Sequence, residues 1–137
     1  TGFTQTINTD AAVEIQGNPA VAVYGSDKLF RFSVGGDGNR LVYDGKITRA
    51  FQVVASLAIR VENANNDFYG FTIAKNGVSL DRSNAVVRID NATQIQSVSI
   101  NSVVDLSNND YIEIFVHRLT GGGNDTLVVF SENVSIK

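Results

Sequence analysis

Residues 94–119, QIQSVSINSVVDLSNNDYIEIFVHRL, decide the fold of this chain. Apolar and polar side chains alternate on both sides of a central turn, as in two β-strands that each bury one face. The turn, residues 107–110, is Ser-Asn-Asn-Asp, and Asn and Asp favour turns because their side chains hydrogen-bond the local backbone. We therefore predict a β-hairpin with one buried face. Its apolar residues are Val98, Ile100, Val104 and Leu106 in the first strand and Ile112, Ile114 and Val116 in the second.

The opposite face of the second predicted strand is also rich in apolar side chains. It carries Tyr111, Glu113, Phe115, His117 and Leu119. A strand face that meets only water is usually polar. We therefore expect another surface to cover this face.

The rest of the chain is a series of short alternating segments without a helical pattern. Residues 49–61 form the longest segment. One face carries the larger apolar side chains and is expected to lie in the core, and the other, lighter face carries smaller side chains and is expected to meet a smooth surface. Asn76-Gly77 is a strong hairpin signal. Further strands are predicted at residues 3–8, 11–16, 21–24, 29–34, 41–43, 68–75, 78–80, 85–89 and 126–136. The pattern predicts an all-β fold, an antiparallel jelly-roll sandwich of about eight to ten strands.

Composition narrows the class of protein. The 137 residues fit one domain over residues 1–137, in which residues 1–28 supply edge strands and a candidate attachment segment. The net charge is -3 and the eleven basic residues are scattered, so we expect no nucleic-acid partner. No apolar run approaches the roughly 18 residues of a membrane span, so we expect no membrane partner. The absence of cysteine excludes disulfides and thiolate metal sites.

Few side chains are candidates for catalysis or metal binding. His117 is the only histidine, and no G-x-S-x-G motif is present. Glu113 and Glu132 are the only carboxylates that we would nominate as an acid–base pair, and solvated strand faces explain them equally well. We therefore expect no enzyme activity, no cofactor and no metal. One alternative stays open: the Asn-rich turns at residues 63–67 and 108–110 offer oxygen ligands of the kind that calcium prefers.

Three segments carry a resemblance to a known family. They are Arg49-Ala-Phe-Gln-Val-Val-Ala-Ser-Leu, Phe71-Thr-Ile-Ala-Lys-Asn-Gly and Val104-Asp-Leu-Ser-Asn-Asn-Asp-Tyr-Ile-Glu-Ile. They resemble successive strands of the jelly-roll superfamily that includes tumour necrosis factor and the globular heads of complement-type proteins. Over residues 29–137 the chain looks most like the variety found in phage virion structural proteins.

This resemblance implies a ten-stranded jelly roll that assembles as a homotrimer around a three-fold axis. The apolar strand faces would then form the subunit interface. The residues that we predict for this interface are Tyr111, Phe115, His117, Leu119, Phe68 and Tyr69. In such a trimer, three copies of His117 would meet at the axis and bind an ion or repel one another at low pH. The loops would face a partner, for which we predict Asn63, Asn65, Asn66, Asp67, Gly121, Gly122, Gly123, Asn124 and Asp125.

The resulting expectation is a non-enzymatic protein of the virion surface. It would act as a trimeric capsid decoration protein or head-fibre module, with a capsid protein or another virion component as its partner. The first alternative is the receptor-binding tip of a phage tail fibre or spike, with a host-surface glycan as its partner. The second alternative is a secreted carbohydrate-binding module.

Overall fold

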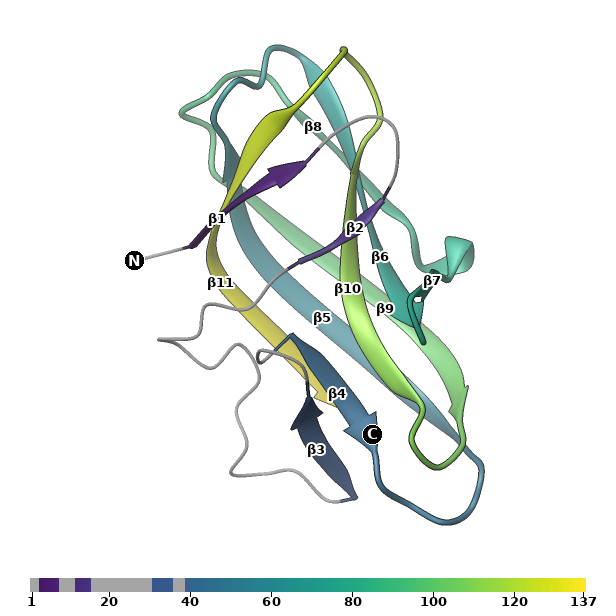
Figure 1. Cartoon of the computed structure of the whole chain (residues 1–137). Helices are drawn as coiled ribbons and strands as arrows, with labels where there is room; N and C mark the ends of the chain where they lie inside the picture. Colours follow the sequence, from purple (N-terminus) through teal and green to yellow (C-terminus); the bar gives the residue numbers. More distant parts are fainter. Residues whose placement is uncertain (1–2, 8–11, 16–30, 36–38) are drawn as a thin grey trace.

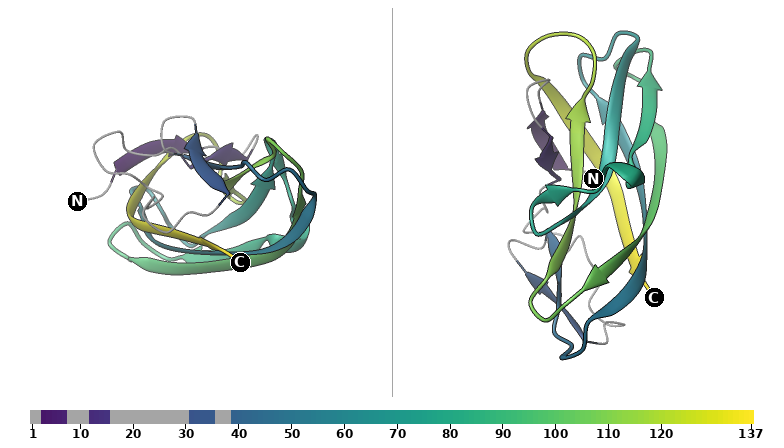
Figure 2. Two further views of the ribbon diagram at one scale, coloured as in Figure 1. Left: turned by 90° about the horizontal axis from the view of Figure 1, so that it is seen from below. Right: turned by 90° about the vertical axis from the view of Figure 1, so that its right-hand side faces the viewer.

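A computed structural model describes residues 3–7, 12–15, 31–35 and 39–137, and all structural statements below concern these residues. They form eleven strands in two antiparallel sheets that face one another across a common core (Figures 1 and 2). The predicted all-β sandwich is therefore confirmed. The predicted strand at residues 21–24 lies outside the described residues.

The first sheet, here sheet A, has four strands in the order β1-β11-β5-β9. These are β1 (Phe3–Ile7), β11 (Asp125–Ile136), β5 (Arg49–Val61) and β9 (Gln96–Leu106). The predicted long segment 49–61 is β5 itself, and it pairs with β11 on one side and with β9 on the other. β1 lies at the edge, as predicted for the start of the chain.

The second sheet, here sheet B, is built around β10 (Tyr111–Arg118) and β6 (Asp67–Lys75), which pair with each other. β4 (Arg40–Tyr43) and β2 (Val13–Glu14) pair with successive parts of the other edge of β10, and β3 (Phe32–Gly35) pairs with β4. β7 (Val78–Ser79) and β8 (Ala85–Ile89) pair with the free edge of β6. A single 3-10 turn, η1 (Asp81–Ser83), connects β7 to β8.

The predicted hairpin at residues 94–119 is wrong, although its strands, its turn and its buried residues are observed. β9 belongs to sheet A and pairs with β5, whereas β10 belongs to sheet B and pairs with β6. The turn at 107–110 therefore carries the chain from one sheet to the other. This arrangement buries the two apolar faces against one another across the core. The long strands β5, β6, β9, β10 and β11 alternate between the sheets in the same way, as in a jelly roll.

The alternation of side chains along each strand determines which residues form the core. In β5 the side chains of Val53, Ala55, Leu57, Ile59 and Val61 are at most 3% exposed, and they meet the equally buried inner faces of β6, β9, β10 and β11. Tight turns join these strands. Asn76 and Gly77 both have positive φ, 52° and 80°, as a type I′ turn requires, which confirms the predicted hairpin between β6 and β7.

Candidate interaction surface

The outer face of sheet B brings together three exposed apolar side chains, Phe68, Val86 and Leu119, with the half-buried Phe115 and His117. In the strand register, His117 of β10 lies opposite Gly70 of β6, which lies opposite Val86 of β8. Residues paired in this way project from the same face of a sheet. Phe68 is two residues from Gly70, and the backbone N–H of Leu119 donates to the Phe68 carbonyl at 2.8 Å. We call Phe68, Gly70, Val86, Phe115, His117 and Leu119 the sheet B surface.

Three large apolar side chains of this surface are exposed. Phe68 is 39% exposed, Leu119 41% and Val86 51%. Gly70 hollows the middle of the surface, since a Cβ atom there would lie 2.8 Å from Oδ1 of Asn84 and 3.4 Å from Cδ1 of Leu119. The resulting depression has a volume of about 260 Å³, and its described lining residues are Ala12, Gly70, Thr72, Ser79, Asp81, Asn84, His117 and Leu119.

The structure brings four of the six predicted interface residues together and separates two. Phe68, Phe115, His117 and Leu119 lie in the sheet B surface. Tyr111 lies six residues from His117, roughly 20 Å along β10, where the Arg40 guanidinium covers its ring at 4.3 Å.

Tyr69 is the one predicted interface residue that the structure contradicts. It is 0% exposed because alternation turns it into the core, and its hydroxyl donates to Asp125 at 3.1 Å. A side chain without exposed surface cannot contact another subunit in this conformation. Val86 and Gly70 were missed, and the alternation in residues 85–89 was the signal that could have identified Val86.

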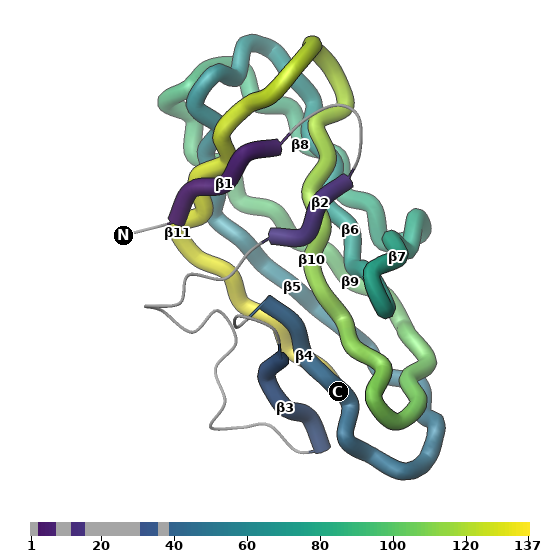
Figure 3. Tube along the Cα trace, in the orientation of Figure 1, coloured from purple at the N-terminus to yellow at the C-terminus, as the bar shows by residue number. Residues whose placement is uncertain are grey.

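The two predicted partner-facing loops lie side by side at one end of the sandwich, where the chain also turns between β8 and β9 (Figure 3). The backbone N–H of Asn63 donates to the Asp125 carboxylate at 3.0 Å, and that of Asn66 donates to the Asp90 carbonyl at 3.1 Å. Asn63, Asn65, Asn66 and the segment 121–124 are exposed. We call this region the loop end.

A buried polar cluster lies beneath the loop end and holds its two main loops together. Arg118 lies 3.2 Å from the Asp67 carboxylate and 3.9 Å from that of Asp125. Thr120 donates to Asp67 at 3.1 Å. Burial, and then the charge of Asp125, raises the pKa of Tyr69 above its ordinary value. Asp67 and Asp125 are only 8% and 2% exposed, so the prediction that these two residues face a partner is wrong. Their carboxylates are needed inside the chain as counter-charges for Arg118.

A second cluster of charged side chains lies on the outer side of sheet B, where β2 and β4 meet the edge of β10. Arg40 lies 3.3 Å from the Glu113 carboxylate and 3.9 Å from that of Glu14. Burial, reinforced by Glu14, raises the pKa of Glu113 to about 7. The carboxylate neighbour of Glu113 is therefore Glu14, whereas Glu132 belongs to the other sheet. The nominated pair Glu113 and Glu132 does not form.

Glu132 occupies an unusual position in β11. A register shift between Val129 and Ser131 changes the alternation, so Glu132 lies opposite the buried Leu57. Its two carboxylate oxygens are buried and accept no hydrogen bond from the described residues. This burial raises its pKa to about 8. The carboxyl group is therefore largely protonated at neutral pH.

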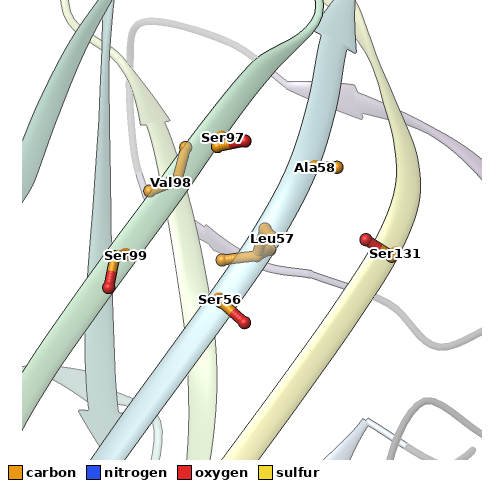
Figure 4. Close-up of a pocket in the computed structure, with 7 residues that line it drawn as sticks. All are labelled: Ser56, Leu57, Ala58, Ser97, Val98, Ser99 and Ser131. Carbon is orange, nitrogen blue, oxygen red and sulfur yellow. The ribbon is translucent and has the colours of Figure 1, made fainter.

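The outer face of sheet A differs in character from that of sheet B. Ser99, Ser56 and Asn133 form one row across β9, β5 and β11, and Ser97, Ala58 and Ser131 form the next. Between these rows lies an open depression of about 290 Å³, whose lining residues come from the three strands (Figure 4). The lighter face predicted for residues 49–61 is thus an outer surface, with small polar residues around the depression and the exposed valines Val54 and Val103 further along the same face.

Two other kinds of site are absent from the part of the chain that the structure describes. Among the described residues, no three His, Cys, Asp or Glu side chains gather as a metal site would require. The described residues also include no helix with the length and apolar character needed to cross a membrane. No protein-family model matches the chain, and no curated protein matches it.

Proposed function

We propose that this chain is a non-enzymatic protein of the virion surface, a capsid decoration protein or head-fibre module that assembles as a homotrimer through the sheet B surface. Its action is association: subunits pack their sheet B surfaces together, and exposed loops contact a capsid protein or another virion component. The observation that carries the proposal is the exposure of Phe68, Val86 and Leu119 on one continuous sheet face.

Covering this face would recover hydrophobic free energy that offsets part of the cost of association. Complete burial of one large apolar side chain contributes about 1.5–3 kcal/mol, so covering the exposed fractions of Phe68, Val86 and Leu119 contributes roughly 1 kcal/mol each. Three subunits together would gain on the order of 10 kcal/mol from these contacts. Polar neighbours at the rim, such as Arg88 beside Phe68, would then fix the orientation.

Purified particles from the source of the sequence provide the test of the virion role. Particles banded on a density gradient should contain peptides of this chain at a constant ratio to the major capsid protein. Recovery of the chain only from the soluble fraction of the same lysate would overturn the proposal. Antibody labelling of intact particles then distinguishes a head position from a tail position.

A second candidate function is the receptor-binding tip of a tail fibre or spike. The loop end favours it, because two exposed loops are held together on a rigid buried cluster, and binding residues are commonly placed on loops of this kind. A glycan array with the intact protein tests this candidate. Binding that is lost when Asn63, Asn65 and Asn66 are replaced by Ser would support it, and an array without any signal would count against it.

A further inference from the structure

A cleft opens at the end of the sandwich opposite the loop end, where β5 begins. It has a volume of about 300 Å³ and is lined by Arg31, Tyr43, Arg49 and Phe51. These residues come from both sheets: Arg31 and Tyr43 flank the β3–β4 pair, and Arg49 and Phe51 belong to β5. The cleft is distinct from the sheet B surface, with which it shares no residue.

The floor of the cleft is aromatic. The rings of Phe32, Tyr43 and Phe51 contact one another in pairs, with centroid separations of 5.0–5.3 Å. Tyr43 is fully buried, and its hydroxyl donates to the Ile47 carbonyl at 2.7 Å. Phe51 is half-buried and so presents part of its ring to the cleft. Three rings that brace one another form a rigid apolar floor.

One wall of the cleft carries the positive charge of Arg49. Arg49 shares the inner face of β5 with Phe51 and Val53, so alternation directs its side chain toward the space between the sheets. The Arg49 guanidinium forms no ion pair or hydrogen bond with the described residues. Arg31 lines the other side, and its φ of 63° is a left-handed conformation that non-glycine residues rarely adopt. Such strained positions concentrate at binding sites.

We propose that this cleft binds an acidic sugar, a pyranose ring that carries a carboxylate. The guanidinium of Arg49 receives the carboxylate, since arginine matches carboxylates with two parallel hydrogen bonds. The apolar face of the sugar ring lies on Phe51. The volume of the cleft is at the lower end of the range for ligand pockets, which fits a single sugar residue.

Titration of the intact protein with D-glucuronate, followed by NMR, tests the proposal. Glucuronate should shift the Arg49 and Phe51 signals in a saturable manner. D-glucose has the ring without the carboxylate and acetate has the carboxylate without the ring, so each should bind at least about tenfold more weakly. Acetate or inorganic phosphate binding as tightly as glucuronate would reveal a general anion site and overturn the proposal. Glucose binding as tightly would overturn it too.

Two variants and a control test whether glucuronate binds in this cleft. Arg49→Gln, at an exposed side chain, should weaken glucuronate binding about tenfold or more, and Phe51→Leu should weaken it while leaving acetate binding unchanged. Arg60→Gln is the matched control, since it removes one partly exposed positive charge at the other end of β5. Unchanged affinity in Arg49→Gln, or an equal loss in Arg60→Gln, would overturn the assignment. The outcome is independent of self-association, because the sheet B surface contributes no lining residue.

Discussion

Nη2 of Arg40 lies 3.3 Å from Oε2 of Glu113, a carboxylate whose side chain is only 3% exposed. Glu14 of β2 lies on the same guanidinium, at 3.9 Å. One arginine thus serves two carboxylates at the junction where the N-terminal strand β2 meets β10. The protonation of Glu113 therefore affects how firmly β2 is held.

We expect the stability of the protein to fall as the pH rises from 4.5 to about 7, because of Glu113. The pKa of Glu113 is raised from 4.5 to about 7, so the folded protein binds this proton more tightly than the unfolded chain. The contribution to stability is complete below pH 4.5 and is lost as the pH approaches 7. Between pH 4.5 and 7, the free energy of unfolding measured with urea should fall by about 1–2 kcal/mol because of this group. Glu113→Gln should remove this part of the pH dependence, and an unchanged slope in the variant would contradict the prediction.

Glu132→Leu should stabilise the protein, most strongly above pH 8. The buried Glu132 carboxyl accepts no hydrogen bond from the described residues, and it must lose its proton near pH 8 in an apolar setting. A leucine avoids this cost, and we expect a gain of about 1–2 kcal/mol in the free energy of unfolding at pH 9. Glu62→Leu, at an exposed acidic side chain, is the control and should change the stability by less than about 0.5 kcal/mol. Destabilisation by Glu132→Leu would indicate that the carboxyl group has a favourable role.

Removing Arg118 should be among the most damaging single changes. Its side chain is 9% exposed and neutralises two buried carboxylates, so Arg118→Met leaves Asp67 and Asp125 unpaired. We expect the free energy of unfolding, measured with urea, to fall by about 3–5 kcal/mol. Arg88→Met breaks the exposed ion pair with Asp90 and should cost less than about 1 kcal/mol. Equal costs for the two variants would show that the buried cluster does not hold the loop end together.

Gly77→Ala should destabilise the β6–β7 hairpin. The φ of Gly77 is 80°, a conformation that alanine adopts only with strain, and the expected cost is about 1 kcal/mol in thermal or urea unfolding. Gly122→Ala is the control, because φ there is not positive and nothing lies within 4 Å of the added methyl group. If both substitutions were neutral, the turn geometry would not be contributing to stability.

Local pattern predicted the strands well and their partners poorly. Residues 49–61 alternate without interruption over thirteen positions, so both ends and the inner face of β5 could be predicted. The same alternation in residues 94–119 identified the buried side chains but not the sheet to which each strand belongs. A four-residue turn can join two strands of one sheet or cross between two sheets. The choice depends on pairing with distant strands, here β5 and β6.

The candidate site was predicted in part for a related reason. Phe68 and Tyr69 are adjacent and must lie on opposite faces, and the inner face could have been identified because Tyr69 alternates with Phe71 and Ile73. The partner of the Tyr69 hydroxyl could not be predicted, because Asp125 is 56 residues away. Glu132 points inward because of the register shift after Val129, and no turn residue in the sequence marks that shift.

Sedimentation equilibrium at micromolar concentration tests self-association through the sheet B surface most directly. We expect the wild-type protein to sediment as a trimer of its 14.7 kDa chain and the double variant Phe68→Ser, Leu119→Ser to sediment as a folded monomer. Val103→Ser, at a 58% exposed valine on the outer face of sheet A, should remain trimeric. A wild-type protein that sediments as a monomer, or a double variant that remains a trimer, would contradict the account.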